Sequence, residues 1–224
     1  INAGLWKGYN LWDLYNKAYT PLHWHKKLFK YAKSLGIKIF STPFDETAVD
    51  FLEKLNCPIY KIASFEMTDL NLVKKIAKTK KPLIISTGMA NLEEIETTLK
   101  TAKKNGAKDI TLLYCVSNYP SLIDDFNLNN IKILKKKFKC KIGLSDHSND
   151  NRVAIVSIAC GAEVIEKHIA LDISLKLGEY IAEAFPEINI IYTRTTSETF
   201  LELRERTQLA NNNNADLFIS VHCD

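Results

Sequence analysis

Short apolar stretches alternate with longer amphipathic stretches along most of this chain. The short runs have the length and character of buried strands, and the longer stretches repeat apolar residues at helical spacing. Mostly uninterrupted apolar strands that alternate with helices favour a parallel sheet that is covered on both faces. The strands are predicted at Ile37–Phe40, Ile59–Ala63, Pro82–Ile85, Ile110–Tyr114, Lys141–Leu144 and Glu163–Ile165.

The intervening helices are bounded by residues that commonly begin or end a helix. Thr20 is predicted as the N-cap and Pro21 as the first residue of one helix, and Gly36 is predicted to end it. Six consecutive strand–helix units favour an α/β fold of the (β/α) TIM-barrel type, although periodicity cannot close the ring and an open layer is expected. The helices are predicted at Leu11–Ala18, Leu22–Leu35, Glu46–Leu55, Leu70–Lys78, Leu92–Asn105, Ile131–Phe138 and Val153–Ala162.

A hydroxyl side chain follows each of five successive predicted strands. Because the C-terminal ends of parallel strands meet at one edge of the fold, these side chains are expected on one rim. Hydroxyls and backbone N–H groups beside Lys61 suit a phosphate, and Glu66 is the carboxylate close enough in sequence to share the site. Each hydroxyl taken alone is better explained as a helix N-cap, but five on one rim favour an anion site. The residues are Thr42, Ser64, Ser86, Ser117 and Ser145.

Two histidines follow the last two predicted strands, His147 after the first of them and His168 after the second. The helix between them, closed by Gly161, completes a βαβ unit, so both rings are expected at the same edge of the sheet. Two imidazoles at one edge could hold a divalent metal. The alternative is that each is an ordinary polar loop residue, and the residues alone leave the two interpretations about evenly balanced.

Composition narrows the class of protein. The chain has 224 residues, 46% hydrophobic and 25% charged, which is ordinary for one globular domain of barrel size. Its net charge of +4 is small, so we expect a mild preference for anionic substrates and no nucleic-acid partner. No apolar run is long enough to span a membrane, and the five cysteines lack metal or disulfide spacing, so a cytoplasmic protein with reduced thiols is expected. The chain opens with Ile1 rather than Met, and we expect a fragment of something longer.

Six strings occur in order along the chain: Phe-Ser-Thr-Pro-Phe-Asp (40–45), Tyr-Lys-Ile-Ala-Ser-Phe-Glu (60–66), Ile-Ser-Thr-Gly-Met (85–89), Tyr-Pro (119–120), Gly-Leu-Ser-Asp-His-Ser (143–148) and Val-Ile-Glu-Lys-His (164–168). With them, residues 1–172 resemble the catalytic barrel of the sialic acid synthase family over about three quarters of the chain. The opening segment, which includes Gly-Leu-Trp-Lys-Gly (4–8) and Leu-His-Trp-His (22–25), is more similar to the pseudaminic acid synthase branch than to the N-acetylneuraminate branch.

The resemblance implies a carbon–carbon bond-forming transferase of carbohydrate biosynthesis, which condenses phosphoenolpyruvate with an N-acetylated amino sugar to give a nonulosonic acid. It implies that Mn²⁺ or Mg²⁺ binds at His147 and His168 and polarises the sugar aldehyde. Lys61 and Glu66 are implied as catalytic residues and Tyr119 as a sugar contact, and full-length relatives form homodimers. The implied phosphoenolpyruvate contacts are Lys61, Thr42, Ser64, Ser86, Ser145 and Ser117, the last standing where some relatives carry asparagine.

Beyond Asp172 the resemblance changes. Residues 173–224 resemble a zinc-dependent N-acetylmuramoyl-L-alanine amidase, through Leu-Lys-Leu-Gly-Glu-Tyr-Ile (175–181), Ile-Tyr-Thr-Arg-Thr (191–195) and Ala-Asp-Leu-Phe-Ile-Ser-Val-His (215–222). This fragment is predicted to append two extra αβ units to a barrel that is truncated at its N-terminus. Both families can claim residues 166–172, so we expect a chimera made by recombination or mis-assembly at that stretch.

Three functions therefore stay open. The first is the synthase, impaired because the family's opening strand–helix–strand, a later Gly-Pro-Asp sugar-binding loop and an antifreeze-like domain are not found in this chain. The second is a zinc amidase acting on peptidoglycan, with Glu166 and His222 as zinc ligands and a replacement for a missing early histidine. The third is an inactive chimeric fragment that binds phosphate or metal weakly, which is the expectation for this chain although the synthase describes its ancestry.

Overall fold

The computed structural model describes residues 10, 12–13, 16, 20–118, 121–148 and 151–167. The chain divides into two compact units, one of residues Pro21–Lys167 and the other of Ile1–Thr20 with His168–Asp224. In the second unit Trp12, Asp13 and Asn16 are helical, in agreement with the helix predicted near the N-terminus. Everything that follows concerns the unit of residues 21–167.

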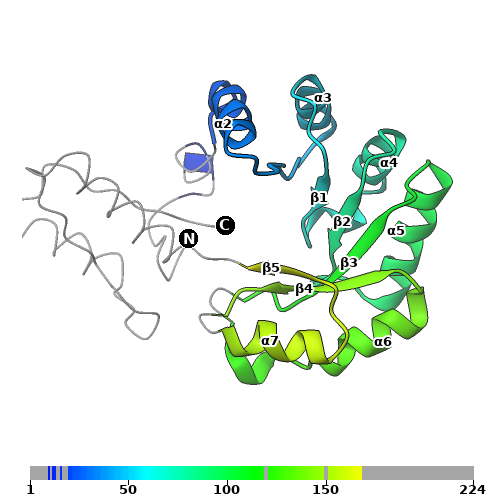
Figure 1. Cartoon of the computed structure of the whole chain (residues 1–224). Coiled ribbons are helices and arrows are strands. Elements are labelled where there is room, and N and C mark those ends of the chain that lie inside the picture. Colours follow the sequence, from blue (N-terminus) through cyan, green and yellow to red (C-terminus); the bar gives the residue numbers. More distant parts are fainter. Residues whose placement is uncertain are drawn as a thin grey trace, which may run out of the picture. The chain divides into compact units, whose positions relative to one another are not determined.

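Five parallel strands of the described residues form one sheet in the order β1-β2-β3-β4-β5. Parallel neighbours in sequence order require crossover connections, and a helix lies in each of the four connections between these strands, as the alternating pattern predicts. Figure 1 shows that the sheet is curled and that helices lie on its convex side, which is the arrangement of a (β/α) barrel seen here as an open half-barrel. The strands are β1 (Tyr60–Ile62), β2 (Leu83–Ser86), β3 (Ile110–Cys115), β4 (Lys141–Asp146) and β5 (Val164–Lys167).

The strand predicted at Ile37–Phe40 does not form. Only the next residue, Ser41, pairs with the sheet, through a single parallel bridge to Tyr60. Ile37 is 60% exposed and Phe40 is 39% exposed, so this apolar run lacks the burial that stabilises a strand in a covered sheet. The described sheet therefore begins at β1 and has five strands where the sequence pattern predicts six.

Successive residues of each strand point alternately to the helices and to the concave side. One helix-facing row consists of the register partners Ile62, Ile85, Leu112 and Ile142, all 0% exposed and all in the hydrophobic core. Lys61, one position before Ile62, therefore faces the concave side. Helices cover the convex face of the sheet, and buried side chains such as Lys61 lie on its concave face.

Three helix starts are capped by side chains. Asp45 accepts a hydrogen bond from the Ala48 backbone N–H, Asp69 caps the next helix in the same way, and Asn91 forms a capping box with Glu94. Local sequence therefore specifies the starts of these three helices. The helices are α2 (Leu22–Ser34), α3 (Glu46–Lys54), α4 (Leu70–Lys78), α5 (Leu92–Lys104), α6 (Asn129–Phe138) and α7 (Asn151–Ala159), with 3₁₀ turns η1 (Glu66–Thr68) and η2 (Ile123–Asp125).

The start of helix α2 differs from the predicted one. Pro21, with ψ of 131°, is the N-cap, and no side chain caps the helix, so the predicted roles of Thr20 and Pro21 are wrong. An extended ψ places Pro21 outside the helix instead of at its first position. The end is as predicted, because Gly36 adopts a left-handed φ of +70° and Ile37 N donates to Ala32 O at 3.0 Å.

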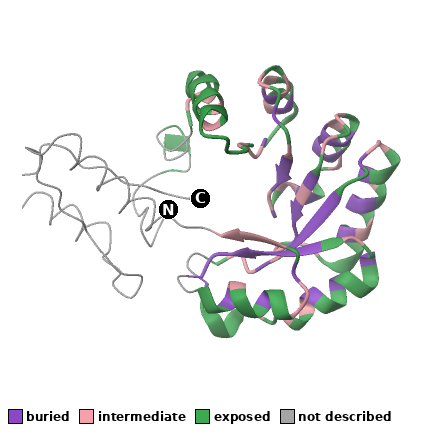
Figure 2. Cartoon of the chain, in the orientation of Figure 1, coloured by how far each residue is buried: buried purple, intermediate pink, exposed green. Residues whose placement is uncertain are grey.

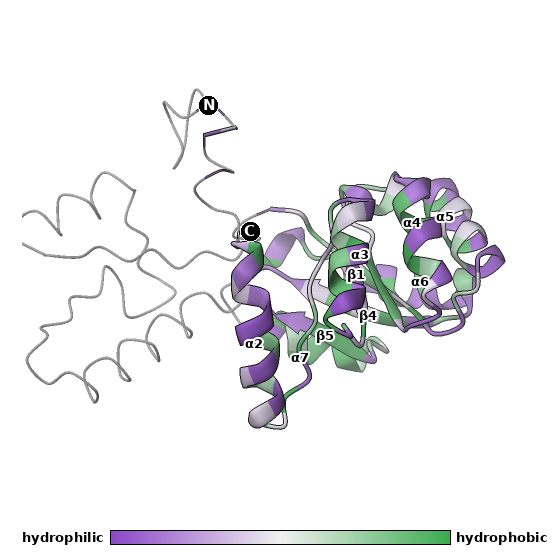
Figure 3. Ribbon diagram, turned by 90° about the horizontal axis from the view of Figure 1, so that it is seen from above, coloured by the Kyte–Doolittle hydropathy of each residue, from purple (hydrophilic) through white to green (hydrophobic). Residues whose placement is uncertain are grey.

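Burial is concentrated on the strands and on the helix faces that touch them (Figure 2). Helix α4, for example, buries Leu72, Val73, Ile76 and Ala77, whereas α2 contains no buried residue. Figure 3 shows the same division in hydropathy, with hydrophilic residues along the outer surfaces of the helices. Each fully buried aliphatic side chain contributes roughly 1.5–3 kcal/mol, so the contact between sheet and helices dominates the stability of this unit.

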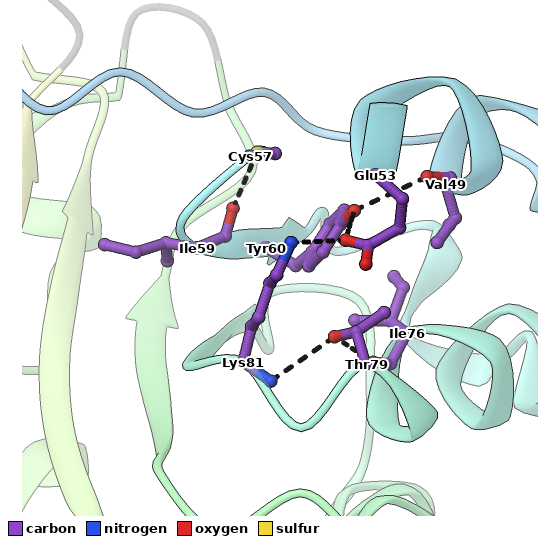
Figure 4. A network of polar contacts seen from close by, with 8 residues as sticks. All are labelled: Val49, Glu53, Cys57, Ile59, Tyr60, Ile76, Thr79 and Lys81. Atoms are coloured by element: carbon purple, nitrogen blue, oxygen red, sulfur yellow. Dashed lines mark hydrogen bonds and ion pairs between the residues drawn. The ribbon is translucent and has the colours of Figure 1, made fainter. Parts of the chain in front are cut away.

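A polar network joins α3 to the start of β1 (Figure 4). Tyr60 Oη donates to Glu53 Oε1 at 2.6 Å, and Lys81 Nζ donates to the same oxygen at 2.5 Å. Burial by itself raises the pKa of Glu53, but the hydrogen bonds from Lys81 and Tyr60 outweigh it and lower the pKa overall. The network lies at the end of the sheet opposite the strand C-termini, where (β/α) folds place stabilising contacts instead of chemistry.

No helix in the described ranges is long and apolar enough to cross a lipid bilayer. Cys57, Cys115, Cys140 and Cys160 are free thiols, and Cys223 lies outside the described residues. Burial raises the pKa of the Cys140 thiol.

Candidate functional site

Lys61 of β1 and Glu166 of β5 meet across the concave face of the sheet. Lys61 Nζ lies 3.2 Å from Glu166 Oε1, and the two side chains are 7% and 30% exposed. They stand on the outer strands of the described sheet, which would lie about 19 Å apart if the sheet were flat. The curl of the sheet therefore brings a buried ammonium group to the opposite strand.

Ser145 and His147 extend this contact along β4. Ser145 Oγ donates to Glu166 Oε2 at 2.6 Å and lies 3.3 Å from His147 Nε2. His147 Nδ1 lies 2.8 Å from the carbonyl oxygen of Val116, just after β3. Lys61, Glu166, Ser145 and His147 thus form a connected polar group, called here the rim cluster, at the C-terminal edge of the sheet.

Ser86 provides a buried hydroxyl on the same face. The register pairs Lys61 with Ile84, and Ser86 follows two positions later, so the sheet alternation turns it to the concave side. Ser86 is 2% exposed, and its Oγ has no hydrogen-bond partner among the described residues. A buried hydroxyl without a partner is costly unless a ligand or water satisfies it.

The loop after β2 packs tightly against the ends of β1 and β3. Gly88 N donates to Ser64 Oγ at 3.2 Å. A Cβ atom at Gly88 would lie 2.3 Å from Ser117 Oγ and 3.1 Å from the Cys115 carbonyl oxygen, so only glycine fits here without a shift. This close approach fixes Ser64 and Ser117 at the rim.

Glu66 begins η1 shortly after β1, and its Oε2 atom is buried without a hydrogen-bond partner among the described residues. Burial raises the pKa of the Glu66 carboxyl, while its own backbone N–H and the charge of Lys61 act in the opposite direction with smaller effect. A carboxyl group with a raised pKa keeps its proton at higher pH than an exposed glutamate does. Glu66 is therefore suited to proton transfer.

Asp146 and Lys167 form a second ion pair, on the opposite face of β4 and β5. Lys167 Nζ donates to Asp146 Oδ2 and to the Ser148 carbonyl oxygen, each at 2.8 Å, and Asp146 is 0% exposed. Asp146 Oδ1 also accepts from Ser148 N at 2.9 Å. Because Asp146 precedes His147 and Lys167 precedes His168, the pair fixes the strand ends from which the two predicted metal ligands follow.

Three predicted phosphate ligands, Lys61, Ser86 and Ser145, share the concave face. The two serines belong to β2 and β4 themselves, whereas the sequence pattern predicts them beyond the strand ends. The reason is that the backbone pairing between neighbouring strands continues beyond the apolar residues. It includes the pairs Ser86↔Leu113 and Ser145↔Glu166.

The other predicted ligands lie at the same edge of the sheet. Thr42 follows the bridge residue Ser41, Ser64 accepts from Gly88, and Ser117 Oγ lies 3.7 Å from Cys115 Sγ. The sugar contact and the remaining metal ligands predicted from the sequence lie outside the described residues and stay predictions: Tyr119, His168 and His222.

The contacts of Glu166 with Lys61 and Ser145 are missed by sequence reasoning, which indicates Glu166 only as a zinc ligand of the amidase alternative. A signal for them exists. Glu166 directly follows the apolar residues Val164 and Ile165 at the start of β5. The alternation of side chains along a strand places Glu166 on the concave face, beside Ser145 of β4. A charged residue at such a position requires a partner of opposite charge.

His147 is the described half of the predicted metal pair. His147 Nδ1 donates to the Val116 carbonyl oxygen, and many metal-bound histidines are oriented by such a contact. In residues 20–118, 121–148 and 151–167, no group of three or more His, Cys, Asp or Glu is arranged to hold a metal ion. His147 therefore fits as one ligand, and the complete metal site stays a prediction.

The fold and the rim cluster define a class of site. A buried ammonium, hydroxyl donors and a carboxyl with a raised pKa converge at the C-terminal edge of a (β/α) half-barrel, where enzymes of this architecture bind substrates. Such a set suits a small anionic molecule whose reaction needs charge stabilisation and proton transfer.

The chain matches the NeuB family model over residues 2–186 and belongs to that family. It is 47% identical over 176 residues to the pseudaminic acid synthase of Helicobacter pylori, covering 79% of this chain and 52% of that protein. It is 43% identical over 177 residues to the N,N'-diacetyllegionaminic acid synthase of Campylobacter jejuni, covering 78% and 53%. The crystal structure of N-acetylneuraminic acid (sialic acid) synthetase from Leptospira borgpetersenii in complex with citrate matches with a TM-score of 0.69 and 30% identity, covering 91% of this chain and 75% of that one.

These matches confirm the predicted resemblance to the sialic acid synthase family. The chain spans about half the length of the curated relatives it matches. The family match runs to residue 186, past the predicted boundary at Asp172. That boundary, and the amidase resemblance of residues 173–224, fall outside the described residues and stay predictions.

Proposed function

We propose that this chain is the barrel portion of a nonulosonic acid synthase, which condenses phosphoenolpyruvate with an N-acetylated amino sugar. The observation that carries the proposal is the buried Lys61 ammonium on the concave face, with the Ser86 and Ser145 hydroxyls on the same face. This donor set suits a phosphate or carboxylate group. The identity to the Helicobacter pylori protein supports the pseudaminic acid branch.

In the proposed reaction, C3 of phosphoenolpyruvate forms a bond to the aldehyde carbon of the open-chain sugar. Water adds to C2, where positive charge has developed, and inorganic phosphate leaves as the C2–O bond breaks. The aldehyde oxygen gains a proton and the added water loses protons, so no oxidant or reductant is needed. Lys61, Ser86 and Ser145 hold the phosphate and balance its charge from binding to release, with Thr42, Ser64 and Ser117 at the same rim.

Glu66 is proposed to accept a proton from the attacking water and to donate a proton to the aldehyde oxygen. Its raised pKa and its unpartnered buried oxygen support this role, because a carboxyl that is protonated part of the time can act as acid and as base. The charge of Lys61 acts on Glu66, which supports a location close to the phosphate. Tyr119 is proposed as a sugar contact.

A divalent metal, Mn²⁺ or Mg²⁺, bound at His147 and His168 would supply Lewis-acid polarisation of the aldehyde oxygen. The orientation of His147 by the Val116 carbonyl supports its part in this site. The Asp146–Lys167 ion pair would hold the two histidine-bearing strand ends together.

The test is the release of inorganic phosphate from phosphoenolpyruvate, with and without Mn²⁺ and with a panel of N-acetylated amino sugars. Phosphate is expected only when metal and the correct sugar are both present, and not from Lys61→Met. The matched control is Lys135→Met, which removes an exposed lysine paired with Glu163. The assay is also run on a version extended to the full length of the relatives. No release from either version would contradict the proposal.

A further inference from the structure

Among the described residues, Glu166 and Glu66 both interact electrostatically with the buried Lys61 ammonium. The two carboxyl groups differ in their hydrogen bonding. Glu166 uses both oxygens, one at 3.2 Å from Lys61 Nζ and one accepting from Ser145 Oγ at 2.6 Å. Glu66 has a buried oxygen without a partner, and burial raises its pKa. Glu166 is therefore the counter-charge of Lys61 in this structure.

The two groups that Glu166 binds are also two of the proposed contacts of phosphoenolpyruvate. An ammonium and a hydroxyl that donate to a carboxylate present the same donor set that a carboxylate or phosphate of a substrate would use. The internal carboxylate and an external anion therefore compete for Lys61 and Ser145.

The solvent exposure of the Lys61 and Glu166 side chains indicates which of the two can move away when an anion binds. The Lys61 side chain is 7% exposed and is held in place, because a buried ammonium cannot turn to water. The Glu166 side chain is 30% exposed, so its carboxylate can turn toward solvent at small cost once another anion replaces it. Displacement of Glu166 leaves no buried charge unpaired.

We propose that Glu166 is an internal counter-ion of the anion site, which holds Lys61 and Ser145 in position and is displaced from them when an anionic ligand binds. This inference rests on the proposed role of Lys61 and Ser145 in binding phosphoenolpyruvate. Glu166 is a positioning residue, since it acts through Lys61. Its return to Lys61 after reaction assists the release of inorganic phosphate, and its competition keeps the affinity for anions below that of an uncompensated ammonium.

The test compares wild type with Glu166→Gln in the full chain, by calorimetric titration with phosphoenolpyruvate and, separately, with inorganic phosphate. Glutamine keeps the size of the side chain and an acceptor for Ser145 but removes the negative charge. Both ligands are expected to bind about tenfold more tightly to the variant, since the competing charge is gone. In turnover, KM for phosphoenolpyruvate and kcat are both expected to fall, because phosphate is released more slowly.

The matched control is Glu163→Gln, which removes a 45% exposed carboxylate paired with Lys135 just before the same strand and is expected to leave both affinities unchanged. Unchanged or weaker affinity in folded Glu166→Gln would overturn the proposal. If that variant does not fold, Glu166→Asp shortens the side chain, lengthens the contact to Lys61 and is expected to raise anion affinity by a smaller factor. Affinity equal to wild type in Glu166→Asp would then overturn it.

The two proposals fail in different ways. A folded wild-type chain that binds neither phosphoenolpyruvate nor phosphate contradicts the proposed function. A wild type that binds phosphoenolpyruvate with the same affinity as Glu166→Gln contradicts the counter-ion role alone.

Discussion

The Asp146 carboxylate binds the Lys167 ammonium at 2.8 Å, one position before His147 on one strand and one position before His168 on the next. Asp146 is 0% exposed, and it also accepts a hydrogen bond from the Ser148 backbone N–H. The ion pair thus ties the C-terminal ends of β4 and β5 together on the face opposite the rim cluster. The contact reinforces the backbone pairing of these two strand ends, which precede the predicted metal ligands.

Replacing Asp146 with Asn is expected to lower the free energy of unfolding by about 3 kcal/mol, because Lys167 loses its charged partner in a largely buried site. Denaturant unfolding measures this change. The control is Asp109→Asn, whose pair with Lys141 has side chains 50% and 54% exposed and should contribute much less to stability, because water screens it. Equal losses in the two variants would show that the Asp146–Lys167 pair does not fix the strand ends.

Ser86→Ala is expected to leave the free energy of unfolding unchanged or to raise it slightly, because its buried Oγ has no partner to lose among the described residues. The same variant should weaken phosphoenolpyruvate binding about tenfold. The control is Ser121→Ala, since Ser121 Oγ donates to the Val116 and Asn118 carbonyl oxygens and its removal should cost about 1 kcal/mol. Loss of stability without loss of binding in Ser86→Ala would assign this hydroxyl a structural role.

Glu66→Gln should stabilise the chain at neutral pH and abolish turnover. Burial raises the pKa of Glu66 in the folded chain, so the folded state binds this proton more tightly than the unfolded state does. The contribution of Glu66 to stability therefore declines as pH rises from about 4.3, the ordinary glutamate value, through the raised folded pKa. Unfolding measured across pH should show no gain in the variant below about pH 4 and a growing gain above it. A pH-independent difference would be inconsistent with a raised pKa.

Tyr60→Phe is expected to lower the free energy of unfolding by about 1.5 kcal/mol, since it deletes the hydrogen bond to the Glu53 carboxylate. The pKa of Glu53 is lowered in the folded chain, so the stability that it contributes is present above the ordinary pKa and is lost as pH falls through the folded value. The cost of Tyr60→Phe should therefore shrink below about pH 4. The control is Tyr31→Phe, at a residue 66% exposed, and an equal cost in both variants would contradict this role of the network in Figure 4.

Local sequence predicts helix starts from residue 46 onward well where a side chain caps the helix, as at α3, α4 and α5. Helix α6 has no side-chain cap and begins at Asn129, two residues before its predicted start. Helix α4 has the predicted bounds, and Asn91 begins α5 with a complete capping box. The strand predicted at Ile37–Phe40 fails because burial depends on neighbours that local sequence does not specify. The predicted strands end before Ser86 and before Asp146, whereas the observed strands include these residues. Backbone hydrogen bonding between strands continues through polar residues, and a search for apolar runs does not detect them.

Part of the candidate site could likewise be predicted from the sequence, and part of it could not. Lys61, Ser86 and Ser145 could be placed on one rim because parallel strands end at the same edge. The contact between Lys61 and Glu166 could not, because it depends on how strongly the sheet curls, which is a property of all its strands together. Figure 1 shows that curl directly, and no local pattern encodes it.

Titration of the wild-type chain and of Lys61→Gln with phosphoenolpyruvate, without sugar, tests the central claim most directly. Saturable binding is expected in wild type, with affinity reduced about 100-fold in Lys61→Gln, because the buried ammonium is proposed to balance the charge of the ligand. Lys135→Gln, at an exposed lysine, should bind as wild type does. Equal affinity in wild type and a folded Lys61→Gln variant, or no binding to the folded wild type, would contradict the account.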